Sequence, residues 1–165
     1  MTPTEPAADA PALQVGDAAP PFTLPSTADA PISLADFRGK QAVVLYFYPK
    51  DDTPGCTIEA CGFRDLTTDY AKAGAAILGV SLDNLNSHRK FVDKFTLPFP
   101  LLSDEDQTVA KAYGVYKLKQ MYGRDYWGIE RTTFLIDKHG KIAKIYPKVK
   151  VDDHHHQVLN DVKAL

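Results

Sequence analysis

The sequence contains only two cysteines, Cys56 and Cys61, among its 165 residues. Two cysteines do not make the disulfide framework that stabilises many small secreted domains. In a reducing compartment, a cysteine pair is more often catalytic, redox-sensing or metal-binding than structural. The scarcity of cysteine therefore makes the surroundings of these two residues the first place to look for chemistry.

The sequence also lacks a long hydrophobic run and a marked excess of charge. Its longest apolar run, residues 42–48, is far shorter than the roughly 18 residues that a transmembrane helix needs. The formal net charge is -2, so we expect no nucleic-acid partner and no membrane partner. Hydrophobic residues make up 44% and charged residues 24%, which is typical of a soluble globular protein.

The first residues, MTPTEPAADAPALQ, have neither a cationic start nor an apolar stretch. We therefore expect no secretory signal and a cytoplasmic location. Their alanine, proline, threonine and acidic composition predicts a flexible lead-in over residues 1–14. Residues 15–165 are long enough to form a single domain with its own core.

The order of the predicted elements is typical of an α/β protein. Runs of apolar and β-branched residues predict strands at 22–24, 32–34, 41–48, 75–81, 101–102, 132–137 and 141–146. Helical spacing of apolar residues predicts helices at 53–73, 87–95, 104–113 and 153–165. This alternation implies a sheet with a mainly parallel centre, to which the last two strands add an antiparallel edge as a hairpin.

Cys56 lies where the strand at 41–48 gives way to a helix, in the segment Pro49-Lys-Asp-Asp-Thr53-Pro-Gly-Cys56. Free backbone N–H groups and the positive end of the helix dipole favour thiolate over thiol at such a position. Thr53 precedes Cys56 by about one helical turn, so its hydroxyl can face the sulfur or the molecule that the sulfur attacks. Pro49 constrains the chain as it leaves the strand. The segment therefore predicts thiol redox chemistry.

Cys61 follows Cys56 by five residues. In an ideal helix this spacing separates the two Cα atoms by roughly 8.5 Å, whereas a disulfide needs them within about 7 Å. A bond between these cysteines would therefore require the first turns of the helix to unwind. We expect a helical reduced state and a partly melted disulfide state.

Three other interpretations of the cysteines are weaker. Free cysteines are often inert core residues, but the Pro49 and Thr53 offsets argue against that here. A thioredoxin-type pair needs Cys-x-x-Cys, and four residues intervene in this sequence. A zinc site would need two further ligands, and no paired histidine spacing supplies them.

The pattern Pro49-x-x-x-Thr53-x-x-Cys56 resembles the peroxiredoxin signature. The run YPKDDTPGCTIEACGFRD is similar to the bacterioferritin-comigratory (peroxiredoxin Q) branch, and GVSLDN, LLSDED and GIERTTFLIDKHGKI extend the similarity over nearly the whole chain after residue 15. The resemblance implies a thioredoxin-like fold with a central mixed sheet, flanking helices and an N-terminal hairpin.

The resemblance also implies roles for particular residues. Cys56 would be the peroxidatic nucleophile and Cys61 the resolving cysteine that closes a disulfide within one chain. Thr53 would hydrogen-bond the peroxide, Arg131 would polarise it and stabilise the thiolate, and Pro49 would shield the site. A thioredoxin-type dithiol would reopen the disulfide, and neither a metal nor an organic cofactor would be needed.

Further polar and aromatic residues have simpler interpretations. Glu59 could be an active-site partner, but an acid in the first turn of a helix more often complements the helix dipole, and we favour that interpretation. We expect Trp127, Tyr122 and Tyr126 to pack rather than to line a substrate mouth. We expect the run 154–156, which is three histidines, to be a solvated helix start, because neighbouring side chains on a helix point in different directions and make a poor chelate.

The sequence therefore predicts a thioredoxin-dependent peroxidase that reduces hydrogen peroxide and organic hydroperoxides. We expect a monomer, because resolution within one helix needs no neighbouring chain. A non-enzymatic redox sensor using the same disulfide and a disulfide-stabilised binding module are the rival hypotheses. Thr53 and Arg131 discriminate against both, because neither rival needs a peroxide-binding arrangement.

Overall fold

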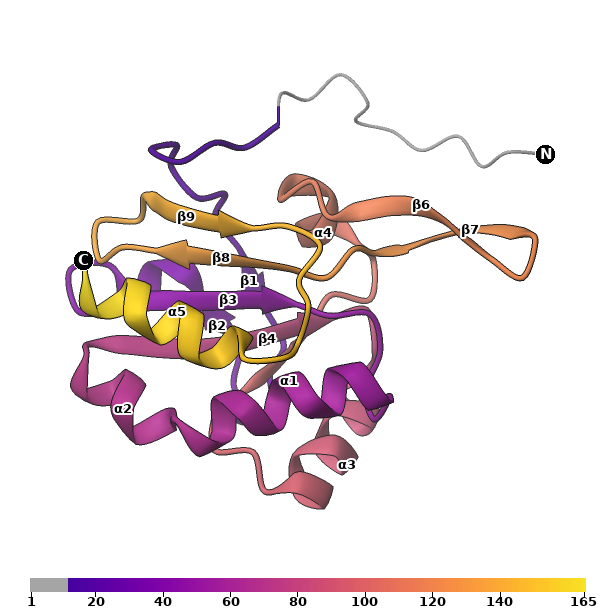
Figure 1. The fold of residues 1–165 in the computed structure, drawn as a ribbon, viewed down its shortest axis with the longest axis horizontal. Helices are drawn as coiled ribbons and strands as arrows, with labels where there is room; N and C mark the ends of the chain where they lie inside the picture. Colours follow the sequence, from indigo (N-terminus) through magenta and orange to yellow (C-terminus); the bar gives the residue numbers. More distant parts are fainter. Residues whose placement is uncertain (1–11) are drawn as a thin grey trace.

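The computed structural model describes residues 12–165 (Figure 1). The predicted flexible lead-in at 1–14 falls largely on residues 1–11, which lie outside the described residues. Within 12–165, no helix has both the length and the hydrophobicity that crossing a membrane requires.

A five-stranded mixed sheet forms the centre of the fold, with its strands in the order β5-β4-β3-β8-β9. β3 pairs in parallel with β4 and antiparallel with β8, while β4–β5 is parallel and β8–β9 antiparallel. The predicted strands and the antiparallel terminal hairpin are confirmed. The bounds are β3 (Ala42–Phe47), β4 (Ala75–Ser81), β5 (Leu101–Ser103), β8 (Thr132–Ile136) and β9 (Ile142–Tyr146).

Helices cover both faces of this sheet, and a small hairpin of β1 (Thr23–Leu24) and β2 (Ile32–Ser33) precedes it, as predicted. Figure 1 shows α1 and α5 crossing the same face of the sheet. The bounds are η1 (Leu34–Phe37), α1 (Pro54–Asp65), α2 (Thr67–Lys72), α3 (Leu85–Phe95), α4 (Thr108–Ala112) and α5 (His154–Lys163).

The single helix expected over 53–73 is two helices, which is a correction. The chain breaks at Leu66, which ends α1 and starts α2 with φ -107 and ψ 9. The hydroxyl of Thr67 donates to the carbonyls of Phe63 (3.1 Å) and Arg64 (2.9 Å) and so competes for the backbone acceptors of the last turn of α1. Gly74 follows α2 with φ +82, the left-handed conformation that glycine adopts readily at the end of a helix.

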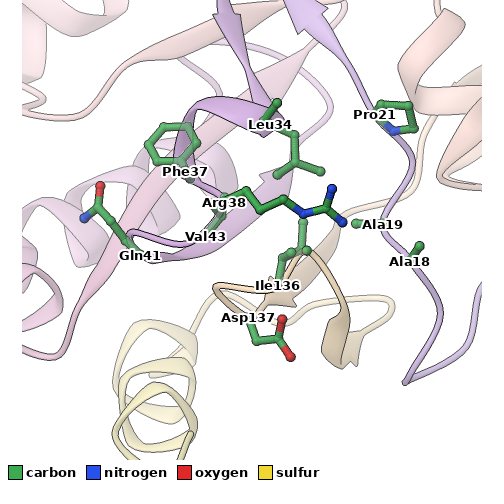
Figure 2. Close-up of a pocket in the computed structure, with 12 residues that line it drawn as sticks. Ala18, Ala19, Pro21, Leu34, Phe37, Arg38, Gln41, Val43, Ile136 and Asp137 are labelled. Atoms are coloured by element: carbon green, nitrogen blue, oxygen red, sulfur yellow. The ribbon is translucent and has the colours of Figure 1, made fainter.

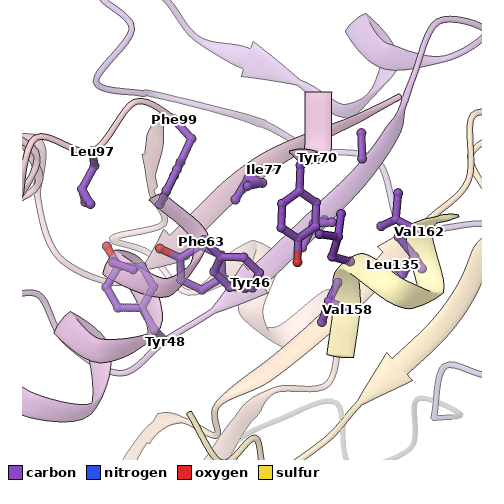
Figure 3. Close-up of a cluster of buried hydrophobic side chains, with 14 of the residues drawn as sticks. Tyr46, Tyr48, Phe63, Tyr70, Ile77, Leu97, Phe99, Leu135, Val158 and Val162 are labelled. Carbon is purple, nitrogen blue, oxygen red and sulfur yellow. The ribbon is translucent and has the colours of Figure 1, made fainter. Parts of the chain in front are cut away.

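Successive residues of β3 enter two separate hydrophobic clusters. Tyr46 and its alternate neighbours pack beneath α1, α2, α3 and α5, in a cluster rich in aromatic rings (Figure 3). Leu45 and its alternate neighbours pack on the other face with α4 and the N-terminal hairpin. Burial on both faces is what a continuous apolar run predicts. It holds β3 firmly, so the loop that follows has a defined starting point.

A second hairpin, β6 (Tyr116–Met121) and β7 (Arg124–Ile129), projects from the body of the protein (Figure 1). It was not predicted. Its turn residues Tyr122 and Gly123 both have positive φ, 54 and 75, as in the tight turns that suit hairpins. The Tyr-Gly pair lacks the asparagine or aspartate that usually signals such a turn.

The aromatic residues of this hairpin differ in their environment. Trp127 stacks on Tyr116 with ring centroids 5.6 Å apart, so packing is confirmed for this residue. Tyr122 is 95% exposed at the turn, and the expectation that it packs is wrong. Tyr126 is also exposed, because a hairpin that stands away from the sheet offers little surface to cover it.

Candidate active site

Cys56 lies in the first turn of α1, directly after the loop that leaves β3. Its side chain is buried, and its thiol is free. Thr53 precedes the helix with extended backbone and makes no side-chain cap, so the first N–H groups of α1 are not satisfied by it. The structure therefore places the Cys56 sulfur at the positive end of a twelve-residue helix, as the sequence predicts.

Arg131 comes to the same place through strand pairing. It directly precedes β8, and the antiparallel register of β8 with β3 sets Thr132 opposite Phe47, the last residue of β3. Both chain segments therefore meet at the carboxyl end of β3. The Nη2 group of Arg131 donates to the sulfur of Cys56 at 3.4 Å, and its Nη1 group donates to Glu59 at 2.6 Å. One guanidinium thus joins the thiol to a carboxylate.

Glu59 contacts Arg131 at the site, in line with the less favoured of its two interpretations, an active-site partner. The favoured interpretation was a complement to the helix dipole, but the side chain is only 1% exposed and is paired with Arg131. Burial raises its pKa to about 7, although the charge and hydrogen bond of Arg131 oppose the rise. Burial alone would lower the pKa of Arg131, but Glu59 and Cys56 together raise it, which keeps the guanidinium charged. A buried carboxylate one turn after Cys56 orients the arginine that faces the sulfur.

Replacing Glu59 with glutamine is expected to remove a pH dependence of stability between about pH 4.5 and 7. The pKa of Glu59 is higher in the folded protein than in the unfolded chain, so the folded protein holds the proton more tightly. The contribution of Glu59 to the free energy of unfolding is therefore fully present below about pH 4.5 and is lost as the pH rises through about 7. Since one pKa unit corresponds to about 1.4 kcal/mol, the free energy of unfolding of the wild type should fall by about 1–3 kcal/mol relative to that of the variant over this range. Urea unfolding at pH 4.5, 6 and 8 measures the difference, and a constant difference would contradict the raised pKa.

Thr53 and Pro49 precede Cys56 on the loop between β3 and α1. The Thr53 hydroxyl donates to the carbonyl of Lys50 at 2.9 Å, so its remaining capacity is to accept hydrogen bonds. Pro49 is half-buried directly beyond β3. The structure therefore keeps Thr53, Pro49 and Cys56 on one short segment at the carboxyl end of β3.

Cys61 lies further along α1, which runs without a break from Pro54 to Asp65. Its thiol is free and half-buried. Cys56 packs in the same cluster as Phe63, whereas Cys61 is outside it, as the helical spacing predicts. Both cysteines are therefore held on different sides of one continuous helix.

Lys119 is a residue near the site that the sequence did not indicate, because the hairpin that carries it was not predicted. Its Nζ group donates to the carbonyl of Ile129 at 2.9 Å, close to Arg131 in the chain. Burial lowers its pKa, and the positive charge of Arg131 lowers it further. Lys119 also interacts electrostatically with Cys56, so the hairpin adds a cation beside the site.

The three histidines at the start of α5 correct two expectations. His156 is exposed, but His154 is buried and within 2.9 Å of the Thr133 hydroxyl, so a fully solvated helix start is wrong. Burial lowers the pKa of His154 to about 4. The rings of His155 and His156 lie 4.4 Å apart, and both offer ligand atoms within 4.8 Å of an Asp153 oxygen. The rings of these neighbouring residues therefore lie close together, contrary to the expectation that they point in different directions.

His155 packs directly on α1 at Gly62, the residue after Cys61. A Cβ at position 62 would lie 2.4 Å from the Nδ1 atom of His155. Gly62→Ala is therefore expected to destabilise the fold by about 1–3 kcal/mol through overpacking, which outweighs a helix-propensity gain of about 0.5–1 kcal/mol. Thermal unfolding measures the loss. In a His155→Ala background the same change should become neutral or stabilising, and an unchanged loss there would rule out this contact as the cause.

A hollow of about 100 Å³ lies at the opposite end of β3 from Cys56. Figure 2 shows the Arg38 guanidinium extending across it toward Ala19, with Val43 and Ile136 in its wall. Its lining holds no cysteine and lies away from the thiol. It belongs to the second hydrophobic cluster rather than to the candidate site.

Known proteins share both the sequence and the fold. The AhpC/TSA family model matches residues 15–145. A putative peroxiredoxin Bcp of Coxiella burnetii is 56% identical over 142 residues, which cover 86% of this chain and 93% of that protein. Peroxiredoxin Bcp of Bacillus subtilis is 48% identical over 153 residues, covering 93% of this chain and 97% of that protein.

Solved structures agree with these sequence relatives. Peroxiredoxin Q of Xanthomonas campestris matches with a TM-score of 0.82 and 43% identity, over 87% of this chain and 90% of that one. The bacterioferritin comigratory protein of the same organism, studied for its alkyl peroxide reduction activity in trapped intermediate and ligand complexes, matches with a TM-score of 0.82 and 42% identity, over 87% of this chain and 90% of that one.

Proposed function

Because this chain belongs to the Bcp/PrxQ peroxiredoxins of the AhpC/TSA family, and is thus a thiol peroxidase, we propose that Cys56 is its peroxidatic nucleophile and Cys61 its resolving cysteine. The single observation that carries the proposal is the Arg131 guanidinium, which bridges the Cys56 sulfur and the buried Glu59 carboxylate. A cation so oriented favours the thiolate, which is the attacking form.

In the first step, the Cys56 thiolate attacks one oxygen of the hydroperoxide. The sulfur–oxygen bond forms as the oxygen–oxygen bond breaks, and the alkoxide or hydroxide that leaves takes a proton. Cys56 is oxidised to a sulfenic acid while the peroxide is reduced to an alcohol or water. Donors from Arg131 meet the charge that develops on the leaving oxygen, which is how such sites accelerate reactions most.

Thr53 and Pro49 assist this step in different ways. The Thr53 hydroxyl, which already donates to Lys50, can accept a hydrogen bond from the O–H of the hydroperoxide. That acceptor would orient the terminal O–H oxygen, which is the oxygen that the Cys56 thiolate attacks. Pro49, half-buried beside it and without an N–H group, limits water at the sulfur.

In the second step, the Cys61 thiol condenses with the sulfenic acid, and the products are an intrachain disulfide and water. α1 runs without a break from Pro54 to Asp65, and Cα atoms five residues apart in a helix are separated by roughly 8.5 Å. A disulfide cannot span that separation while the helix is intact. The first turns of α1 therefore unwind to bring the sulfurs together. Local unfolding of this kind occurs most readily in segments of low local stability, such as the end of a helix.

Oxidation is expected to raise amide hydrogen exchange at least about tenfold over residues 54–61, while β3 keeps its protection. The reason is that the disulfide removes the i to i−4 hydrogen bonds of these turns. Exchange monitored by mass spectrometry on the reduced and the oxidised protein measures the change. Equal exchange in both states would refute the unwinding.

The proposal extends to the substrates and the reductant. Alkyl peroxide reduction, studied in the Xanthomonas campestris relative, supports organic hydroperoxides as substrates beside hydrogen peroxide. The intrachain disulfide makes a thioredoxin or a similar dithiol the fitting reductant, since thiolate attack on a disulfide returns both cysteines to thiols. A monomer in a reducing cytoplasm, with no cofactor, is sufficient for this cycle.

The experiment that tests the function couples peroxide consumption by the wild type to NADPH oxidation through thioredoxin and its reductase. We expect sustained turnover with hydrogen peroxide and with an alkyl hydroperoxide. Peptide mapping after one equivalent of peroxide should find a Cys56–Cys61 bond. Disulfide formation without turnover would instead favour a redox sensor, and a bond between chains would overturn resolution within one helix.

A further inference from the structure

A buried polar network lies beneath the loop that joins β3 to α1. Asp51, in the middle of this loop, is its centre, with only 7% of its surface exposed. The network connects the loop to the end of β4, to the first turns of α3 and to β5. The steps assigned to Cys56 and Arg131 make no use of it. A carboxylate buried this close to a catalytic segment needs an explanation of its own.

Asp51 is held through both its side chain and its backbone. Its carboxylate accepts hydrogen bonds from the hydroxyls of Tyr48 at 2.5 Å and Ser87 at 2.7 Å. The same carboxylate lies 2.7 Å from Nδ1 of His88. The backbone N–H of Asp51 donates to Asp83 at 2.8 Å. Together these bonds immobilise the centre of the loop.

His88 is fully buried and faces an acceptor on each side of its ring. Its Nε2 atom lies 2.8 Å from the carbonyl oxygen of Leu102, which can only accept, so Nε2 carries a hydrogen. Its Nδ1 atom faces the Asp51 carboxyl group, so the ring makes a hydrogen bond on each side. The ring therefore bridges the loop to β5 rigidly.

The same residues offer atoms that a cation could use, since ligand atoms of Asp51, Asp83 and His88 lie within 4.8 Å of one another. Protein donors already engage these oxygens, however. The Ser81 hydroxyl donates to Asp83 at 2.8 Å, beside the N–H of Asp51. The arrangement is that of a hydrogen-bond clamp.

We propose that Asp51 and His88 form a clamp that sets the position of the catalytic loop, which makes His88 a positioning residue for the attack of Cys56 on peroxide. This role rests on the proposed function of Cys56. The chain passes from Asp51 through Asp52, whose backbone is left-handed with φ 56, into Thr53 and α1. A shift of Asp51 therefore moves the groups that meet the peroxide, and a misplacement of about 1 Å can cost on the order of 100-fold in rate.

Two substitutions at position 88 separate the two hydrogen bonds of the ring. In His88→Asn the amide nitrogen takes the place of Nδ1 and retains a donor to Asp51. In His88→Gln the glutamine amide nitrogen takes the place of Nε2 and retains only the bond to Leu102. We expect kcat/KM for peroxide to fall about tenfold or more in His88→Gln, and to stay within about threefold of the wild type in His88→Asn.

The kinetic readout distinguishes positioning from simple loss of fold. The coupled assay reports kcat/KM for peroxide and kcat/KM for thioredoxin separately. Because the reductant attacks a disulfide in an already unwound segment, only the peroxide constant should fall in His88→Gln. Asp51→Asn should show the same pattern. Combining it with His88→Gln should add little to the loss, since both variants remove the bond between Asp51 and His88.

Val109→Ala serves as the stability control, because it opens a cavity in the other hydrophobic cluster, away from the loop. It should lower the melting temperature and leave both kinetic constants near their wild-type values. Equal losses in His88→Asn and His88→Gln, or losses of both constants that follow the melting temperature, would overturn the clamp. Peroxide turnover by Cys56→Ser would instead overturn the proposed function itself.

Discussion

Replacing Cys56 with serine is expected to lower peroxide turnover by at least about 1,000-fold, because loss of an essential nucleophile removes the covalent route altogether. A serine hydroxyl in the same position remains protonated beside Arg131 and attacks peroxide poorly. The coupled NADPH assay measures the loss, and circular dichroism verifies the fold. Turnover within tenfold of the wild type would refute the role of Cys56.

Cys61→Ser is the matched variant, because it changes the other cysteine of the same helix. It should still consume one equivalent of peroxide per chain, and a sulfenic acid on Cys56 should be trapped by a sulfenate-specific reagent. Sustained turnover with thioredoxin should fall, because no intrachain disulfide forms for the reductant to open. If Cys61→Ser formed no sulfenic acid, the division of roles between the two cysteines would be wrong.

Replacing Arg131 with methionine is expected to lower kcat/KM for peroxide by about 100- to 1,000-fold, the effect of removing one well-placed donor from a reacting oxygen. The change deletes both the bond to the Cys56 sulfur and the partner of buried Glu59. Stopped-flow measurement of Cys56 oxidation isolates this step from recycling. A loss below tenfold would show that the arginine is not part of the reaction.

Two further arginine variants sharpen this test. Arg131→Lys keeps the charge but not the fork that reaches Glu59 and Cys56 together, so its rate should lie between those of the wild type and Arg131→Met. Arg38→Met removes an arginine at the opposite end of β3 and should react at the wild-type rate. A loss in Arg38→Met equal to that in Arg131→Met would indicate a general effect of charge.

Local patterns in the sequence predicted most of the central sheet. The run at 41–48 is apolar throughout because β3 is buried on both faces, and such runs are distinctive. The hairpin at β6–β7 was missed because it stands away from the core, so burial does not impose alternation on it. The break at Leu66 was missed because the hydroxyl of Thr67 decides it, and apolar spacing continues across it.

Local sequence was enough to predict the segment from Pro49 to Cys61, because a strand, a turn and a helix set by local chemistry carry both sulfurs at a known spacing. The geometry of one helix was enough to predict that a bond between them requires unwinding. The surroundings of the Cys56 sulfur depend instead on long-range contacts. Arg131 and Glu59 are 72 positions apart and meet through the pairing of β8 with β3. Side-chain contacts across that distance depend on strand register and burial, which no local pattern encodes.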